Sequence, residues 1–182
     1  GYDDLSRENP RIIVAAITPF GQNGPYSDFK TTDLVNIAMG AYAFTTGDAD
    51  RAPLRISFPV SYAHAGAEAA AASTMAHYHR ERTGEGQFID ISIQECIVWT
   101  LMNSTTTWDL AQVNVTRGGS VNRNPVTGVM FRTVWPCKDG NITMMIAGGA
   151  IFGAGARAMV AWMAREGAAT PWLQEVDWDE LD

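Results

Sequence analysis

The sequence predicts an α/β protein, because short apolar strands alternate along it with alanine-rich helices. Residues 11–20 (RIIVAAITPF) form an unbroken run rich in Ile and Val, as expected of a strand covered on both faces. Residues 62–82 are dominated by Ala, the strongest helix former. Residues 87–92 (QFIDIS) have the pattern of a second strand, and another helix is expected from there to about residue 111. This helix, strand, helix order is typical of α/β domains.

Length and composition describe an ordinary globular protein. The chain has 182 residues, of which 46% are hydrophobic, and this is enough apolar material to bury a sizeable core. No run approaches the roughly 20 apolar residues of a membrane helix. The first ten residues, GYDDLSRENP, lack the basic and apolar blocks of a signal peptide. We therefore expect a cytoplasmic protein without a membrane partner.

The net charge of −7 is unevenly distributed along the chain. Outside the last eight positions the sequence is nearly neutral. It therefore offers no basic surface for nucleic acid, and we do not expect nucleic acid as a partner. Five of the 20 acidic residues lie in the last eight positions: Glu175, Asp177, Asp179, Glu180 and Asp182.

Local signals place a loop and two helix starts. Residues 21–30 (GQNGPYSDFK) consist of turn formers, so a loop leaves the carboxyl end of the first strand, where open α/β sheets bind ligands. Thr31 or Thr32 is expected to cap a helix whose first turn holds Asp33. Residues 92–95 have the S-x-x-E form of a capping box.

The composition changes near residue 116. Residues 116–128 (TRGGSVNRNPVTG) have no periodicity, and we expect a linker there, between part of a large domain at 1–115 and the start of a small domain at 129–182. Two apolar runs joined across residues 138–140 predict a hairpin. A final helix is expected near residues 154–165.

Two features of the sequence suggest a nucleotide-binding loop or a metal site but do not match the required patterns. The glycine-rich residues 148–156 (GGAIFGAGA) match neither a dinucleotide fingerprint nor a P-loop, so we expect a tight connection from a strand to a helix. Cys96 and Cys137 have no second Cys or His at metal-ligand spacing, so we expect no metal site and two reduced, buried thiols.

Three polar residues are better candidates for a catalytic or binding role. His64 and Glu68 are spaced i, i+4 on the long helix, so the carboxylate could orient or charge the imidazole for general base catalysis, or the pair could form an ordinary surface hydrogen bond. Lys30 lies in the loop after the buried strand, where a cation could meet a phosphate or carboxylate, although a solvated lysine has the same pattern.

Four segments together resemble the family III (CaiB/BaiF-type) CoA-transferases, which include α-methylacyl-CoA racemase. They are NPRIIVAAITPFGQNGPYSDFK, DLVNIAMGA with TTGDADRAP, HRERTGEGQFIDIS and VWPCKDGNI. They occur in the family's order over most of residues 8–145. The end of the chain, with AWMAREG and EVDW, is similar to the branch of two-subunit transferases of the benzylsuccinate type.

This resemblance implies a fold and a set of partners. Family members are longer, begin with a Rossmann-like half and form interlocked dimers. The chain would then hold part of a Rossmann-like large domain without its first strands, followed by part of a smaller α/β domain. Coenzyme A would be a substrate, as acyl-CoA, rather than a permanently bound cofactor. The partners would be a carboxylic acid and either a homologous subunit or a second copy of the chain.

The resemblance also locates the family's reacting group. A segment before the long helix carries an aspartate that attacks the acyl-CoA carbonyl, so that a mixed anhydride and then an enzyme-bound thioester carry the acyl group. That position is Tyr62 here, in FPVSYAHAG. A phenol, with an ordinary pKa near 10, cannot form the same anhydride.

Other positions match the family better. Lys30 and Asp33 match residues that line the CoA site in members similar to formyl-CoA transferase, and Phe20 and Gly21 match the adjacent loop. The racemase branch has a histidine at the position of Thr32, so racemase activity is the least expected of the family's reactions.

Three hypotheses follow. The chain could be a transferase subunit whose reacting aspartate lies on a homologous partner, which we favour. It could be an active acyl-CoA enzyme that uses Glu68 or His64. It could also be a pseudoenzyme that binds an acyl-CoA or a protein without catalysis.

Overall fold

The computed structural model describes residues 1–181 and divides into two compact units. Residues 1–119 and 123–129 form the first unit, and residues 120–122 join residue 130 and those beyond it in the second. Residues of the predicted linker therefore occur in both units, and the division of the chain into domains remains a prediction.

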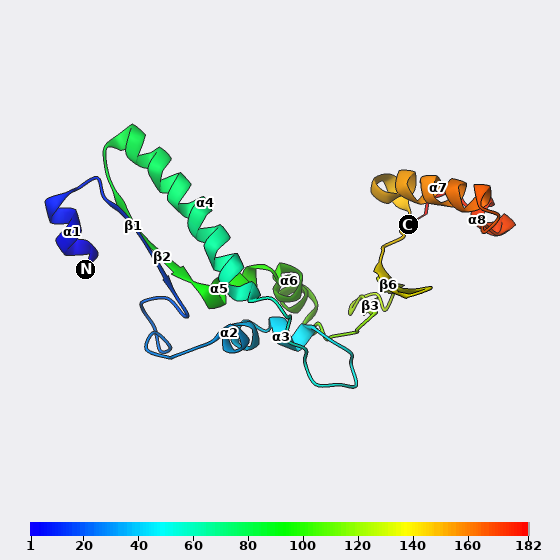
Figure 1. The fold of residues 1–182 in the computed structure, drawn as a ribbon, viewed down its shortest axis with the longest axis horizontal. Coiled ribbons are helices and arrows are strands. Elements are labelled where there is room, and N and C mark those ends of the chain that lie inside the picture. Colours follow the sequence, from blue (N-terminus) through cyan, green and yellow to red (C-terminus); the bar gives the residue numbers. More distant parts are fainter. Residues whose placement is uncertain (182) are drawn as a thin grey trace. The chain divides into compact units, whose positions relative to one another are not determined.

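The first unit consists of a two-stranded sheet and six helices (Figure 1). The strands are parallel, with a register that runs from Ile13 opposite Gln87 to Thr18 opposite Ser92. The elements in chain order are α1 (Tyr2–Glu8), β1 (Ile13–Thr18), α2 (Asp33–Met39), α3 (Tyr42–Thr45), α4 (Val60–Thr83), β2 (Gln87–Ser92), α5 (Ile93–Trp99) and α6 (Met102–Ala111).

The parallel pairing confirms the predicted α/β class. Parallel strands need a long crossover, and here the crossover from β1 to β2 contains α2, α3 and α4. Helix α4 runs alongside both strands (Figure 1). The long alanine-rich helix and the two strands that frame it lie close to their predicted positions.

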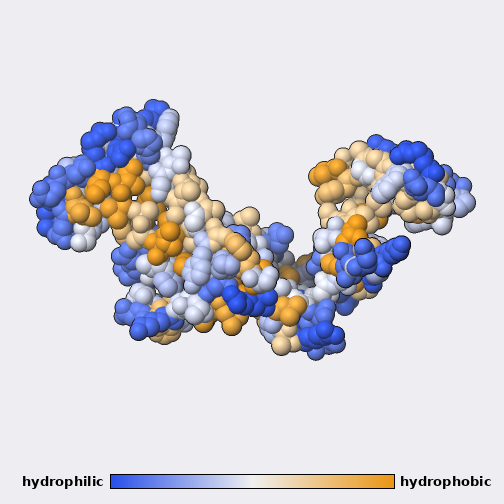
Figure 2. Space-filling model, in the orientation of Figure 1, coloured by the Kyte–Doolittle hydropathy of each residue, from blue (hydrophilic) through white to orange (hydrophobic). Residues whose placement is uncertain are grey.

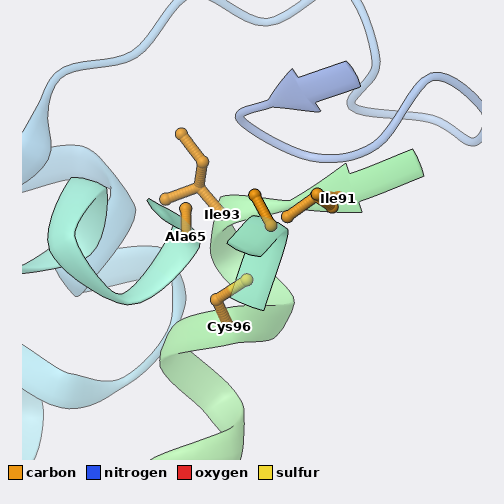
Figure 3. Packing of buried hydrophobic residues seen from close by; sticks show 5 residues of the cluster. Ala65, Ile91, Ile93 and Cys96 are labelled. Carbon is orange, nitrogen blue, oxygen red and sulfur yellow. The ribbon is translucent and has the colours of Figure 1, made fainter. Parts of the chain in front are cut away.

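Small side chains let α4 approach the sheet closely. Ala65 and Ala69 of α4 pack with Ile91 at the end of β2 and with Ile93 and Cys96 of α5 (Figure 3). A second buried cluster, Ile37, Ala43 and Ile97, joins α2 and α3 to α5. The two clusters fix the start of α4 relative to the carboxyl ends of the strands.

The predicted helix through residue 111 is interrupted. Its start is as expected, because the Ser92 hydroxyl accepts a hydrogen bond from the Glu95 amide at 3.3 Å. It is nevertheless two helices, α5 and α6, and the Thr100 hydroxyl donates to the Ile97 carbonyl at 2.7 Å at the break. Such bonding back to the preceding turn favours bending of a helix.

The second unit holds the predicted hairpin and the final helix. Strands β5 (Val134–Cys137) and β6 (Gly140–Thr143) are antiparallel, and β3 (Val121–Arg123) pairs with β4 (Met130–Arg132). Helix α7 (Gly149–Arg165) packs Ala156 and Val160 against Trp178, and α8 is Pro171–Glu175. Cys137 is exposed, so the expected burial is wrong for it, whereas Cys96 is buried.

The glycine-rich stretch is also placed differently from the prediction. It lies mostly inside α7, which begins at Gly149 rather than near residue 154. A Cβ atom on Gly153 would lie 2.5 Å from the Trp178 carbonyl oxygen. The glycine therefore allows the backbone of the 178 segment to pack directly on the helix.

The surface of the first unit carries exposed apolar side chains. Leu5, Ile17 and Phe88, from α1 and the two strands, are among them, and Figure 2 shows the apolar surface in this region. Among residues 1–181, no helix combines the length and hydrophobicity needed to cross a membrane. The same residues contain no cluster of side chains suited to hold a metal ion.

Candidate functional site

A buried carboxylate joins the start of α2 to the start of α4. Asp33, the first residue of α2, is only 5% exposed. Its Oδ1 accepts hydrogen bonds from the Ser61 amide at 3.0 Å and from the Ser61 hydroxyl at 2.8 Å. A carboxylate that accepts backbone N–H groups in the first turn of a helix satisfies their unpaired donors and complements the helix dipole.

Further hydrogen bonds extend this buried network. The Asn36 side-chain amide donates to the Ser61 hydroxyl oxygen at 3.4 Å, and the Thr31 hydroxyl donates to the Asn36 side-chain oxygen. Asn36 and Ser61 are fully buried. Because buried polar groups are costly to leave unpaired, this network fixes one arrangement of the two helix starts.

Tyr62 follows this anchored residue directly. It lies in the first turn of α4, and its side chain is 48% exposed. The spacing of Tyr62, Ala65 and Ala69 is i, i+3, i+7, so Tyr62 shares the side of α4 that packs on β2 and α5. Its hydroxyl makes no hydrogen bond within residues 1–181.

The loop after β1 is tied to β2 by an aspartate. The Gln22 amide donates to Asp90 Oδ2 at 2.9 Å, and the Gln94 amide donates to the Pro19 carbonyl at 3.0 Å. Gly21 is buried with φ of +79°, a conformation that glycine adopts without strain. The family's loop residues are therefore held at the carboxyl end of the sheet, as the sequence predicted.

Three aromatic side chains pack within the same loop. The ring of Phe20 lies 5.8 Å from that of Tyr26 and 6.3 Å from that of Phe29, and the Tyr26 and Phe29 rings are 5.2 Å apart. Lys30, next to Phe29, is exposed to solvent. The aromatic cluster thus supports the backbone from which this lysine projects.

Two of the four predicted CoA-binding residues line a common cavity. It has a volume of about 450 Å³, and Phe20, Gly21 and Asn23 of the loop face Ser92, Gln94 and Val98 across it. The carboxylates of Asp90 and Glu95 complete the lining. Lys30 and Asp33 do not line it, and the structure engages Asp33 in the helix network instead.

The two substitute catalytic residues do not form the expected pair. Within residues 1–181, no hydrogen bond joins His64 to Glu68. Glu68 instead lines a second cavity of about 180 Å³ with Asp90, Glu95 and Trp99. Burial, together with the charges of Glu68 and Glu95, raises the pKa of the Cys96 thiol, so this cysteine is a poor nucleophile.

Two arginines that lie in the loop before α4 or contact it were missed by the sequence analysis. The guanidinium of Arg117 donates to the carbonyls of Asp48 at 3.0 Å, Arg51 at 2.7 Å and Phe44 at 3.2 Å. It also stacks over the Phe44 ring, 5.8 Å from its centroid. Arg55 lies beside Asp33, with Nε 3.6 Å from Oδ2. Both contacts join residues distant in sequence, so no local pattern signals them.

The parallel strands, the crossover through α4 and the loop at the strand ends define an α/β protein of the open-sheet class, and the candidate site lies at the carboxyl edge of the sheet. The family model for "CoA-transferase family III" matches residues 1–176. The chain belongs to this family.

Characterised relatives cover most of the chain. The BbsE subunit of succinyl-CoA:(R)-benzylsuccinate CoA-transferase from Thauera aromatica is 32% identical over 170 residues, which are 91% of this chain and 38% of that protein. The succinyl-CoA–D-citramalate CoA-transferase of Chloroflexus aurantiacus is 31% identical over 78% of this chain and 34% of its own length.

A solved structure agrees with the fold. A CAIB/BAIF family protein from Brucella suis matches with a TM-score of 0.71 and 25% identity, over 98% of this chain and 50% of that one. The chain therefore spans about half of this solved relative and just over a third of the curated ones.

Proposed function

We propose that this chain is part of an acyl-CoA:carboxylate CoA-transferase in which it does not supply the reacting carboxylate. The observation that carries the proposal is the position of Tyr62, half exposed in the first turn of α4, where the resemblance to family III places an aspartate. The family match over residues 1–176 supports the reaction class. The name of the relative BbsE describes a subunit of a CoA-transferase, which supports a homologous partner that carries the aspartate.

The chemistry of Tyr62 supports this division of labour. An aspartate is ionised at neutral pH, and its attack on a thioester gives a mixed anhydride that thiolate cleaves readily. A phenol has an ordinary pKa near 10 and would give an aryl ester instead. The tyrosine therefore cannot carry the family's sequence of anhydride and thioester intermediates.

We further propose that the cavity beside Phe20 and Gly21 holds the neutral pantetheine part of CoA. Its lining includes the carboxylates of Asp90 and Glu95, which would repel phosphate groups. The exposed Lys30 is the proposed cation for those phosphates. In this proposal Asp33 contributes through the helix network and not by touching CoA.

The test uses the whole protein that contains this chain, alone and mixed with a homologue that has aspartate at the position of Tyr62. Succinyl-CoA and a panel of carboxylic acids are supplied, and hydroxylamine traps any enzyme-bound acyl group. We expect turnover only in the mixture, with the trapped adduct on the partner's aspartate.

Tyr62→Phe is the matched control, because it removes only the hydroxyl. The mixture that contains Tyr62→Phe should turn over at the same rate as the mixture that contains the unaltered protein. Turnover by the protein alone, with an adduct mapped to residues 61–79, would contradict the proposal.

A second candidate is an active chain that uses Glu68. The observation in its favour is the cavity that Glu68 lines with Asp90, Glu95 and Trp99. It predicts turnover without a partner, and loss of this turnover in Glu68→Gln while CoA binding is retained.

A further inference from the structure

The buried Asp33 has one oxygen that the helix network does not use. Oδ1 is occupied by the amide and hydroxyl of Ser61. Oδ2 is buried and accepts no hydrogen bond within residues 1–181. Its neighbour is Nε of Arg55, at 3.6 Å. Among residues 1–181, this buried negative charge therefore faces a single cation, and it holds the Arg55 side chain near the start of α4.

The guanidinium of Arg55 is only partly used by this contact. A guanidinium has five N–H donors, and arginine that serves a structural ion pair with a carboxylate is frequently bidentate. Here the closest approach is through Nε alone, and Arg55 makes no hydrogen bond within the described residues. Its side chain is 53% exposed. The remaining donors are thus available to a ligand.

The surroundings favour an anionic ligand. The single charges of Asp33 and Arg55 cancel, and the first turn of α4, a helix of 24 residues, adds the partial positive charge of a helix N-terminus. The planar fork of arginine matches the geometry of a carboxylate. Because Asp33 binds the residue that precedes Tyr62, an anion on Arg55 would lie near the position where the family's reacting group is expected.

We propose that Arg55 binds the carboxylate of the acceptor acid, and that Asp33 is its positioning residue. This inference rests on the proposed function. The buried carboxylate fixes the guanidinium before the acid arrives, which reduces the entropy lost on binding. Arg55 is thereby a substrate-binding residue that the resemblance to the family does not supply.

The first experiment measures binding without turnover. In the whole protein, with its partner if one is required, arginine side chains are modified with phenylglyoxal and mapped by mass spectrometry. Succinate should protect Arg55 severalfold. Equal protection by coenzyme A without an acid would assign the site to phosphate and overturn the proposal, as would the absence of protection by either ligand.

Arg51 is the matched control. It lies in the same loop, its side chain is 75% exposed, and its Nε is 3.8 Å from Asp48 Oδ2. It differs from Arg55 in facing an exposed acid rather than a buried one. Succinate should leave its modification unchanged.

Kinetics provide the second test. Arg55→Gln should raise the KM for the acid by about 10-fold to 100-fold, as expected for loss of a charged hydrogen-bonded pair, with an unchanged KM for acyl-CoA. The KM of Arg55→Lys for the acid should lie between the values for the unaltered protein and for Arg55→Gln, because lysine keeps the charge and loses the fork. Arg51→Gln should match the unaltered protein.

The outcomes separate the two proposals. If the assembly transfers CoA and Arg55→Gln leaves the KM for the acid unchanged, the role of Arg55 is wrong and the proposed function stands. If no assembly transfers CoA, the proposed function is wrong, and the protection of Arg55 by succinate still tests its binding role. If Arg55→Gln does not fold, the protection measurement on the unaltered protein decides.

Discussion

The two ends of helix α4 contact charged residues in opposite environments. At its start, Asp33 is buried and pairs with fixed partners on Ser61. At its end, Glu81 lies 3.4 Å from Nη2 of Arg11 and 3.5 Å from Nε of Arg80, with about half of its side chain exposed. Water can replace Arg11 as the partner of Glu81, whereas the carboxylate at the start of the helix is only 5% exposed.

The buried charge at the start of α4 positions residues, whereas the exposed charges at its end contribute to solubility. A buried charge with two good hydrogen bonds fixes a single geometry, because every alternative leaves a polar group unpaired. An exposed pair is screened by water and salt and fixes little. The site is therefore expected at the start of α4, where a buried carboxylate fixes the local geometry.

The largest expected effect comes from removing that carboxylate. Asp33→Ala leaves the amide and hydroxyl of Ser61 without their acceptor and Arg55 without its partner. We expect a loss of about 2–4 kcal/mol in the free energy of unfolding, because each buried donor left without its acceptor costs about 1–3 kcal/mol. Urea unfolding of the whole protein measures it. A loss below about 1 kcal/mol, the range of an exposed pair, would break the comparison between the two ends.

Sequence patterns were sufficient for elements whose signals are local. Alanine content predicted α4, the S-x-x-E pattern predicted the cap at Ser92, and the turn residues around 138–140 predicted the hairpin. In each case the signal comes from residues within a few positions of one another. Propensity and capping act over that range, so the sequence reveals them.

The polar contacts of the site depend on pairs that are distant in the chain. Asp33 meets a residue 28 positions away, and Arg117 reaches carbonyls 66 to 73 positions away. The resemblance to the family implied a place for Asp33 at the CoA site, and nothing near it in the sequence indicates that its carboxylate is buried. The glycines of α7 were misplaced by the sequence analysis, because their contact with Trp178 is formed only by packing.

A smaller and more local effect is expected at Arg117, which holds the loop that leads to Arg55. Arg117→Gln removes most of the donors to the carbonyls of Phe44, Asp48 and Arg51. We expect residues 44–54 to exchange amide hydrogens about 10-fold faster, with global stability nearly unchanged, because exposed charged hydrogen bonds contribute modestly.

Hydrogen exchange followed by mass spectrometry measures this opening. The Leu54 amide, which donates to the Thr46 carbonyl at 3.1 Å, lies within the reporting segment. Arg117→Lys is the control for charge, and it should behave like the glutamine variant, because a single ammonium cannot reach all three carbonyls. Full retention of protection in Arg117→Lys would show that charge, rather than the fork, holds the loop.

The smallest effect is expected at the exposed end of α4. Glu81→Gln removes an acid shared by Arg11, Arg80 and His77, the last with Nδ1 3.9 Å away. Because the side chains of Glu81, Arg11 and His77 are each more than half exposed, we expect the free energy of unfolding to change by less than about 1 kcal/mol, and the change to shrink further in salt. Urea unfolding at low and high ionic strength measures both. A large loss of stability that persists in salt would show that this cluster also fixes the fold. The two ends of the helix would then differ in where their charges lie and not in how much these charges stabilise the protein.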